Sequence, residues 1–225
     1  MRWNDLRPVH GWHVFCTELT VVVLGVMIAL SAEQALSSLH RQGDVRSFRS
    51  AIDKELEWNL TAFNYRLAQD TCVGSRLAEL RQLRDQALNG QSSGVVTEIG
   101  RPGVVTIKTS VWSARDPAVM GAMPLDLRLE YSALYDELAI NYEQITQERE
   151  AWRSLARFNG ARRLSEDDVR TLSELLFRAE SIDRVLRSNS RDVAEKAGRV
   201  GVSASEETRR ALGEADQTLC RPLLQ

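Results

Sequence analysis

The sequence predicts a mainly all-α fold, in which an N-terminal transmembrane helix precedes an antiparallel bundle of long amphipathic helices. Residues 19–32 form an apolar run that nothing else in the chain matches. Three later stretches place apolar side chains three and four residues apart, which puts them on one face of a helix. The connection between the last two stretches is short, which favours antiparallel neighbours.

The apolar run defines the first element. It is about 14 residues long, roughly 21 Å of helix, and therefore shorter than the ~30 Å hydrocarbon core of a bilayer. A span must include weaker residues before the run, so we place the anchor at residues 14–36, with Glu18 inside the helix. Trp3 and Trp12 suit a membrane interface. Two alternatives stay open: a cleaved signal peptide with a site at 29–31, and the core helix of a soluble protein.

The anchor divides the chain into a short head at residues 1–13, the anchor itself, and a helical soluble domain at residues 37–225. Basic residues flank the anchor on both sides, so the positive-inside rule does not decide its orientation. The net charge of −2 gives no electrostatic footprint for nucleic acid. Membrane lipid is the partner that the anchor implies.

One face of the anchor carries small residues. At about 100° per residue, one stripe holds Glu18, Gly25, Ala29, Ala32 and Leu36. The Gly25-x-x-x-Ala29 spacing lets two helices approach closely, and a carboxyl group on the stripe prefers a protein neighbour to lipid. We therefore expect this face to contact a second copy or another membrane protein. The alternative is that small residues are simply common in membrane helices.

The three cysteines have different surroundings. Cys16 lies in or beside the anchor, whereas Cys72 and Cys220 lie in the soluble part. In an oxidising compartment the latter two form a natural pair. A disulfide that closes a loop of about 148 residues would stabilise the fold by roughly 5 kcal/mol through chain entropy. The alternative is two unpaired thiols.

A second helical pattern follows at residues 45–88, with Gly74 weakening its middle and Asn89-Gly90 ending it. Gly43 is a soft break, so this helix and the anchor could form one long stalk. β-Branched runs around residues 100–103 allow a small hairpin near residues 95–108, and an extended loop is the alternative.

The remaining elements are helical. A short helix is expected at residues 110–120, and Pro124 precedes a long one at 125–158. Ser165, with an acidic residue three positions later, predicts the N-cap of a helix that continues to about residue 197. A short last helix is expected from Ser205 towards residue 219.

The residues that usually carry chemistry are sparse. The three histidines, His10, His13 and His40, all lie close to the anchor, and no Cys or carboxylate cluster completes a metal site with them. The core of the soluble domain therefore has no histidine, which is the commonest general base. Its carboxylates, Asp53 and Glu55 among them, are assigned to solvated helix faces. We expect no enzymatic activity, no catalytic residue, no cofactor and no metal site.

Aromatic side chains of the soluble part could line a ligand cavity between helices, and packing in the core is the alternative. These residues are Trp112, Tyr131, Tyr135, Tyr142 and Trp152.

Several parts of the chain together resemble one family: the anchor segment at 18–30, the stretches 109–112 and 131–138, and Cys72 with the terminal Cys220-Arg221-Pro222. They are similar to small, uncharacterised bacterial inner-membrane proteins with a single-pass N-terminal anchor and a helical periplasmic domain. The resemblance implies a bacterial inner-membrane protein with a cytoplasmic head and a periplasmic domain. It implies no known activity and carries over no catalytic residue.

These observations lead us to expect a membrane-anchored interaction or scaffold protein that self-associates through its anchor or contacts another membrane protein. The alternative is a periplasmic ligand-sensing bundle. The head at residues 1–13 has no room for an output domain, so such a sensor would signal through a partner protein, and its small-molecule ligand is unknown.

Overall fold

The structure is a computed structural model that describes residues 11–91, 94–95, 97–103, 106–212 and 217–224. Within those ranges the regular elements are helices and no strand is present, which confirms the all-α class. The helices are α1 (Gly11–Leu67), α2 (Asp70–Leu88), α3 (Ser110–Ser113), α4 (Pro117–Ala122), α5 (Leu125–Leu155), α6 (Glu166–Val200) and α7 (Glu206–Leu212), with the 3₁₀ turns η2 (Ala156–Phe158) and η3 (Gln217–Cys220).

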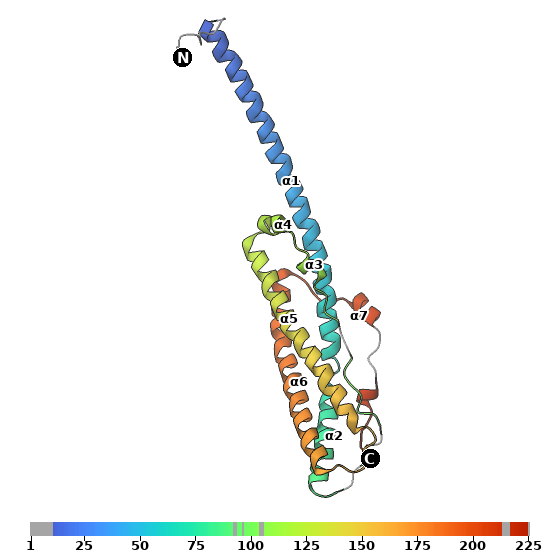
Figure 1. Cartoon of the computed structure of the whole chain (residues 1–225). Helices are drawn as coiled ribbons and strands as arrows, with labels where there is room; N and C mark the ends of the chain where they lie inside the picture. Colours follow the sequence, from blue (N-terminus) through green and yellow to red (C-terminus); the bar gives the residue numbers. More distant parts are fainter. Residues whose placement is uncertain (1–10, 92–93, 96, 104–105, 213–216, 225) are drawn as a thin grey trace, which may run out of the picture.

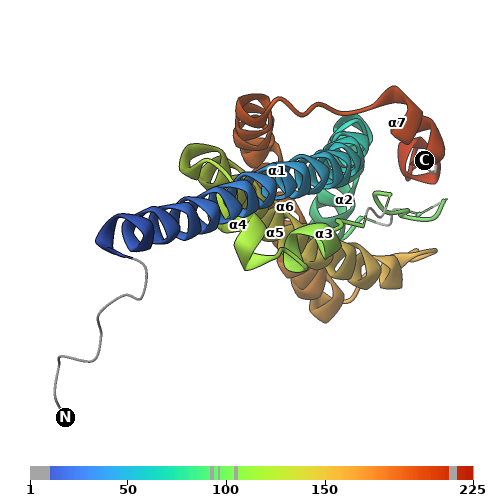
Figure 2. The ribbon, with the colours of Figure 1, turned by 90° about the horizontal axis from the view of Figure 1, so that it is seen from above.

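The first helix, α1, joins the apolar segment to the rest of the molecule without interruption over 57 residues. Its N-terminal part stands alone beyond the other helices in both views (Figures 1 and 2). Gly43 lies inside the helix, which confirms the long stalk. The break before α2 falls at Ala68 and Gln69, several residues before Gly74.

The apolar part of α1 is long and apolar enough to cross a membrane, and none of it is buried. A core helix of this chain would be covered by the other helices, so that alternative is wrong. Of the predicted head, only residues 11–13 are described, and they belong to α1. The division into head, anchor and domain otherwise stays a prediction.

The bundle consists of the C-terminal part of α1 together with α2, α5 and α6. α6 packs along α5 and also contacts α2 and α1 (Figure 1). α5 runs in the same direction as α1 and α2, and α6 returns antiparallel to them. The Ser165–Asp168 capping box starts α6 as the sequence predicts. The core includes fully buried side chains from all four helices: Ile52, Leu56, Leu80, Leu134, Leu138, Leu172 and Leu186.

The segment between α2 and α3 runs back along the bundle as an extended chain. The Ile99 amide donates to Asn159 Oδ1 at 2.9 Å, and the Lys108 amide donates to Asn59 Oδ1 at 2.7 Å. Side chains of neighbouring helices therefore satisfy its main-chain groups. The predicted hairpin near residues 95–108 is wrong for the described part of this stretch, because Val95 forms an isolated antiparallel bridge with Leu224 instead.

Two predicted short helices are divided. The helix predicted at residues 110–120 separates into α3 and α4, because Asp116 caps α4 and accepts the Ala118 amide at 2.6 Å. Pro117 then occupies the first turn, where a missing amide hydrogen costs nothing. The helix predicted from Ser205 ends at Leu212, and η3 begins at Gln217. Residues 213–216 lie outside the described residues.

Candidate functional site

The predicted contact face of the anchor lies on the side of α1 that is turned away from the bundle. We call this stripe of Glu18, Gly25, Ala29 and Ala32 the anchor face, and all four residues are exposed. A Cβ atom added at Gly25 would meet nothing within 4 Å. The backbone of α1 is thus open to close approach along this face.

The anchor face continues along α1 beyond the apolar segment. At about 100° per residue, Gly43 and Ser47 fall on the same stripe, and both are exposed. Ile52 and Leu56 fall on the opposite side of the helix and are fully buried in the core. One face of α1 therefore packs in the bundle, and the opposite face carries small, exposed residues.

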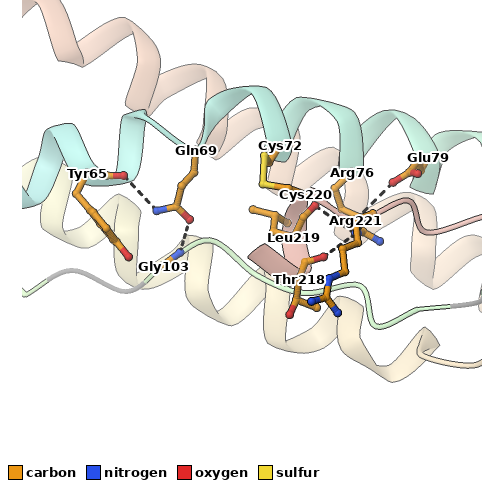
Figure 3. Close-up of a disulfide and its surroundings, with 10 residues drawn as sticks. All are labelled: Tyr65, Gln69, Cys72, Arg76, Glu79, Gly103, Thr218, Leu219, Cys220 and Arg221. Atoms are coloured by element: carbon orange, nitrogen blue, oxygen red, sulfur yellow. Dashed lines mark hydrogen bonds and ion pairs between the residues drawn. A yellow bond between two sulfur atoms is a disulfide. The ribbon is translucent and has the colours of Figure 1, made fainter. Parts of the chain in front are cut away.

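Cys72 of α2 and Cys220 of η3 are joined by a disulfide across a sequence separation of 148 (Figure 3). The predicted pairing of these two cysteines is therefore confirmed. Cys16 on the anchor is an exposed free thiol.

The disulfide is one of several contacts that hold the C-terminal segment on α2. Arg76 is buried, and its Nη2 donates to the carbonyl oxygens of Leu219 at 3.2 Å and Arg221 at 2.6 Å (Figure 3). Burial lowers the pKa of Arg76. Three residues further along α2, Glu79 accepts the Leu223 amide at 2.8 Å. These polar contacts seat the segment so that its leucines can reach the core.

A buried ion cluster joins all four bundle helices, and sequence reasoning missed it. Arg66 of α1 has a fully buried side chain and binds Glu148 of α5 through two nitrogens, with Nε to Oε2 at 2.8 Å. It also lies 2.8 Å from Asp70 of α2 and 3.3 Å from Asp183 of α6. Arg187, half exposed, binds the other oxygen of Asp183. The cluster therefore holds three carboxylates and two guanidinium groups.

Burial and the bonds within the cluster act in opposite directions on the pKa values of its members. Burial raises the pKa of Glu148 and outweighs the hydrogen bond and the charge of Arg66, which act in the opposite direction. Burial raises the pKa of Asp70 in the same way. Burial alone would lower the pKa of Arg66, but its bonds to Glu148 and Asp70 raise it instead, so the guanidinium stays charged. A proton taken up by the cluster therefore goes to a carboxylate.

Glu55 is a second buried carboxylate that the sequence did not reveal. It accepts the Val111 amide at 2.8 Å, the Ser110 hydroxyl at 3.1 Å and the Tyr135 hydroxyl at 2.7 Å. The assignment of Glu55 to a solvated face is therefore wrong, because the start of α3 and the side of α5 cover it. It fixes α3 on α1 and satisfies amide hydrogens at the N-terminus of α3.

The predicted pocket aromatics do not gather around one site. Trp112 stacks on Tyr135 with ring centroids 4.7 Å apart, and Tyr131 and Trp152 are buried in the core. Tyr142 is 44% exposed. Burial and a hydrogen bond to Asp53 raise the pKa of Tyr131 to about 12. These buried aromatics pack the bundle.

Trp112 also borders a surface cleft of about 560 Å³ between the α3–α4 region and α5. The other lining residues are Ser113, Arg115, Pro117, Met120, Arg128, Leu129 and Ser132. We call it the α4 cleft. Its wall is partly apolar and carries two guanidinium groups.

The histidines remain near the anchor. His13 and His40 are exposed, and His10 lies outside the described residues. In the described ranges, no group of three or more His, Cys, Asp or Glu side chains is placed to hold a metal ion.

Comparison of the chain with protein-family models, with curated proteins and with solved structures finds no match. The resemblance to bacterial inner-membrane proteins therefore stays a prediction, and function has to be argued from the geometry of this chain.

Proposed function

We propose that this protein is a membrane-anchored scaffold or interaction protein. In this proposal α1 crosses the bacterial inner membrane once and holds the bundle on the periplasmic side. The anchor face then contacts a second copy of the chain or another membrane protein. The observation that carries the proposal is the continuity of α1, whose anchor face lies opposite the side buried in the bundle.

The continuity of α1 couples the membrane to the bundle mechanically. Gly25 and Ile52 are 27 residues apart on one helix, a rise of about 40 Å. Because no break lies between them, a contact at Gly25 in the membrane fixes which side of the bundle faces the neighbour. A scaffold needs this property, since it must hold its partners in a defined orientation.

The buried polar groups support a structural role rather than a catalytic one. Arg66 and Glu55 are buried, and each binds groups from several helices. A ligand-sensing bundle would need a cavity between its helices. Among the described residues, the Arg66 cluster and the apolar core lie between α1, α2, α5 and α6, and the α4 cleft is open to the surface, so we do not adopt this alternative.

Crosslinking tests the proposed contact face. Single cysteines are placed in the full chain after Cys16→Ser, and intact membranes are treated with a bismaleimide, which reacts with free thiols and leaves the Cys72–Cys220 disulfide intact. Ala29→Cys and Ser47→Cys lie on the stripe, and Met27→Cys lies on the opposite side of the same helix.

We expect Ala29→Cys and Ser47→Cys to give a crosslinked species several-fold more abundant than Met27→Cys gives. A species of twice the chain mass identifies a second copy, and any other mass identifies a different protein. Equal crosslinking at all three positions would contradict the proposed face. Protease digestion of inside-out and right-side-out vesicles tests the periplasmic position of the bundle.

A further inference from the structure

One end of the bundle carries an apolar surface that the rest of the described chain covers only in part. The six residues of α4 read Pro-Ala-Val-Met-Gly-Ala, of which Val119 and Met120 are half-buried and the other four are exposed. In the first turns of α5, Leu125 and Leu129 are 55% and 57% exposed. We call residues 117–129 the α4 lobe. An exposed patch of this kind marks a surface that binds something apolar.

The position of the α4 lobe points to what covers it. In Figure 1, α4 lies at the end of the bundle nearest to the projecting part of α1. α4 packs on α1, and Ala122 and Pro124 face Ser38 and Val45 of α1 across a cleft. The lobe is thus level with the part of α1 that directly follows the anchor.

The distance from the lobe to the bilayer is short. Ser38 and Val45 come two and nine residues after residue 36, where the predicted anchor ends, a rise of about 3 Å and about 14 Å. The headgroup region adds roughly 5–8 Å outside the hydrocarbon core on each side. A typical helix tilt of about 20° towards the lobe would bring α4 into that region.

Two exposed leucines lie on α1 at the height of the lobe, on the side of the helix that faces away from it. Leu36 and Leu39 follow the apolar run and are 57% and 64% exposed. They lie on a stretch that also holds charged and polar residues. Such side chains suit the boundary between headgroups and acyl chains, which therefore extends towards residue 39.

The charged groups beside the lobe suit a phosphate surface. Arg115 donates to the carbonyl of Trp112 at 2.9 Å, and Arg128 donates to the carbonyl of Met120 at 3.2 Å. In the described residues neither guanidinium pairs with a carboxylate. Asp126 lies in the lobe and Asp116 directly before it, so the net charge of residues 115–129 is close to zero and apolar contact has to dominate.

We infer that the α4 lobe rests on the bilayer that the anchor enters, with its apolar side chains at the headgroup–acyl boundary and Arg115 and Arg128 facing lipid phosphates. This inference rests on the proposed single-pass anchor. The bundle is then held at the membrane by two contacts, the span and the lobe, which together fix its tilt as well as its position.

Depth measurements on the full chain test the inference. In a Cys16→Ser background, an environment-sensitive fluorophore is attached to Ala118→Cys in the lobe, to Met27→Cys in the anchor, or to Ala78→Cys on α2 at the far end of the bundle. Each protein is reconstituted into vesicles of phosphatidylethanolamine and phosphatidylglycerol that contain lipid-borne quenchers. We expect quenching at Met27 and Ala118 several-fold above that at Ala78, and a shift of the Ala118 emission to shorter wavelength.

The failures of the two proposals are distinguishable. Strong quenching at Met27 with none at Ala118 would overturn the docking of the lobe and leave the anchor in place. No quenching at Met27 would overturn the anchor itself. A shift of the Ala118 emission to shorter wavelength in native membranes, without such a shift or quenching in the pure lipid vesicles, would show that a membrane protein covers the lobe instead, which also overturns the inference.

A matched pair of exposed substitutions separates docking from folding. Leu125→Asp with Leu129→Asp places charges on the lobe at exposed positions and should reduce the quenching at Ala118 to the level at Ala78. Phe177→Asp on α6 changes a side chain that is 74% exposed and lies outside the lobe. That control should leave the quenching at Ala118 unchanged, and unchanged quenching in the double variant would overturn the inference.

Discussion

Breaking the Cys72–Cys220 disulfide should lower the stability of this protein substantially. The bond joins residues 148 positions apart, and a loop of that length corresponds to about 5 kcal/mol of chain entropy in the unfolded state. In the native state Arg76 and Glu79 still bind the C-terminal segment. The loss therefore acts mainly through the unfolded chain, which gains conformations that the disulfide excluded.

Thermal unfolding of the full chain in detergent micelles measures this effect. Tryptophan fluorescence is a suitable signal because Trp152 is buried. A domain of this size changes its Tm by about 2–4 °C per kcal/mol, so the Cys72→Ser/Cys220→Ser variant should melt about 10–20 °C below the parent. Cys16→Ser, which removes the free thiol alone, should melt with the parent.

A Tm decrease smaller than about 3 °C would refute the reasoning. It would mean either that the bond does not form in the protein isolated from membranes or that the unfolded chain is already compact enough for the crosslink to add little. Thiol counting by mass spectrometry on the unfolded parent distinguishes these two causes.

Three further predictions concern buried charge, pH and backbone conformation. Arg66→Met leaves Glu148 without its cation and should lower the free energy of unfolding by about 3–5 kcal/mol. Arg187→Met should lower it less, because that side chain is half exposed, and urea unfolding of both variants measures the difference. The raised pKa of Glu148 means that the native state binds this proton more tightly than the unfolded state does, so its contribution to stability is present below the ordinary pKa of a glutamate and is lost as the pH rises through the raised pKa. The urea midpoint should therefore change less steeply with pH in Glu148→Gln than in the parent, and an identical slope would contradict the raised pKa. Gly100 has a φ of 69°, and a Cβ atom there would lie 3.0 Å from the Leu219 amide nitrogen, so Gly100→Ala should destabilise the protein by about 1–2 kcal/mol. Gly74 lies in a helix, and a Cβ atom there would meet nothing within 4 Å, so Gly74→Ala should stabilise the protein by up to about 1 kcal/mol in the same urea assay.

Local signals predicted the long helices well. The capping box at Ser165 and the apolar spacing that follows place α6 correctly, and Pro124 marks the start of α5. Both signals depend on residues within a few positions of one another. At the break at Ala68 and Gln69 the apolar spacing lapses, because Asp70 and Thr71 follow Leu67 by three and four positions. No glycine or proline stands there to mark a helix end, so the pattern at residues 45–88 predicted one helix where the structure has two.

The buried charges are visible in the sequence only as charged residues at apolar positions of a helix. Arg66 follows Phe63 by three positions, and Glu148 lies between Ile145 and Trp152 at helical spacing, so each charge sits on an apolar stripe. A charge at such a position requires a partner. The partner could not be named, because Arg66 and Glu148 are 82 residues apart.

The sequence by itself determined the helical class, the long anchor-bearing helix and the face of small residues on it, because periodicity and hydropathy are properties of neighbouring residues. Only the tertiary structure decided that this face points away from the bundle, that Arg66 joins four helices, and that α4 lies exposed beside the end of the anchor. Each of these facts depends on how segments far apart in the chain pack together. Long-range packing is chosen by the total burial and pairing of the fold, and no local pattern records it.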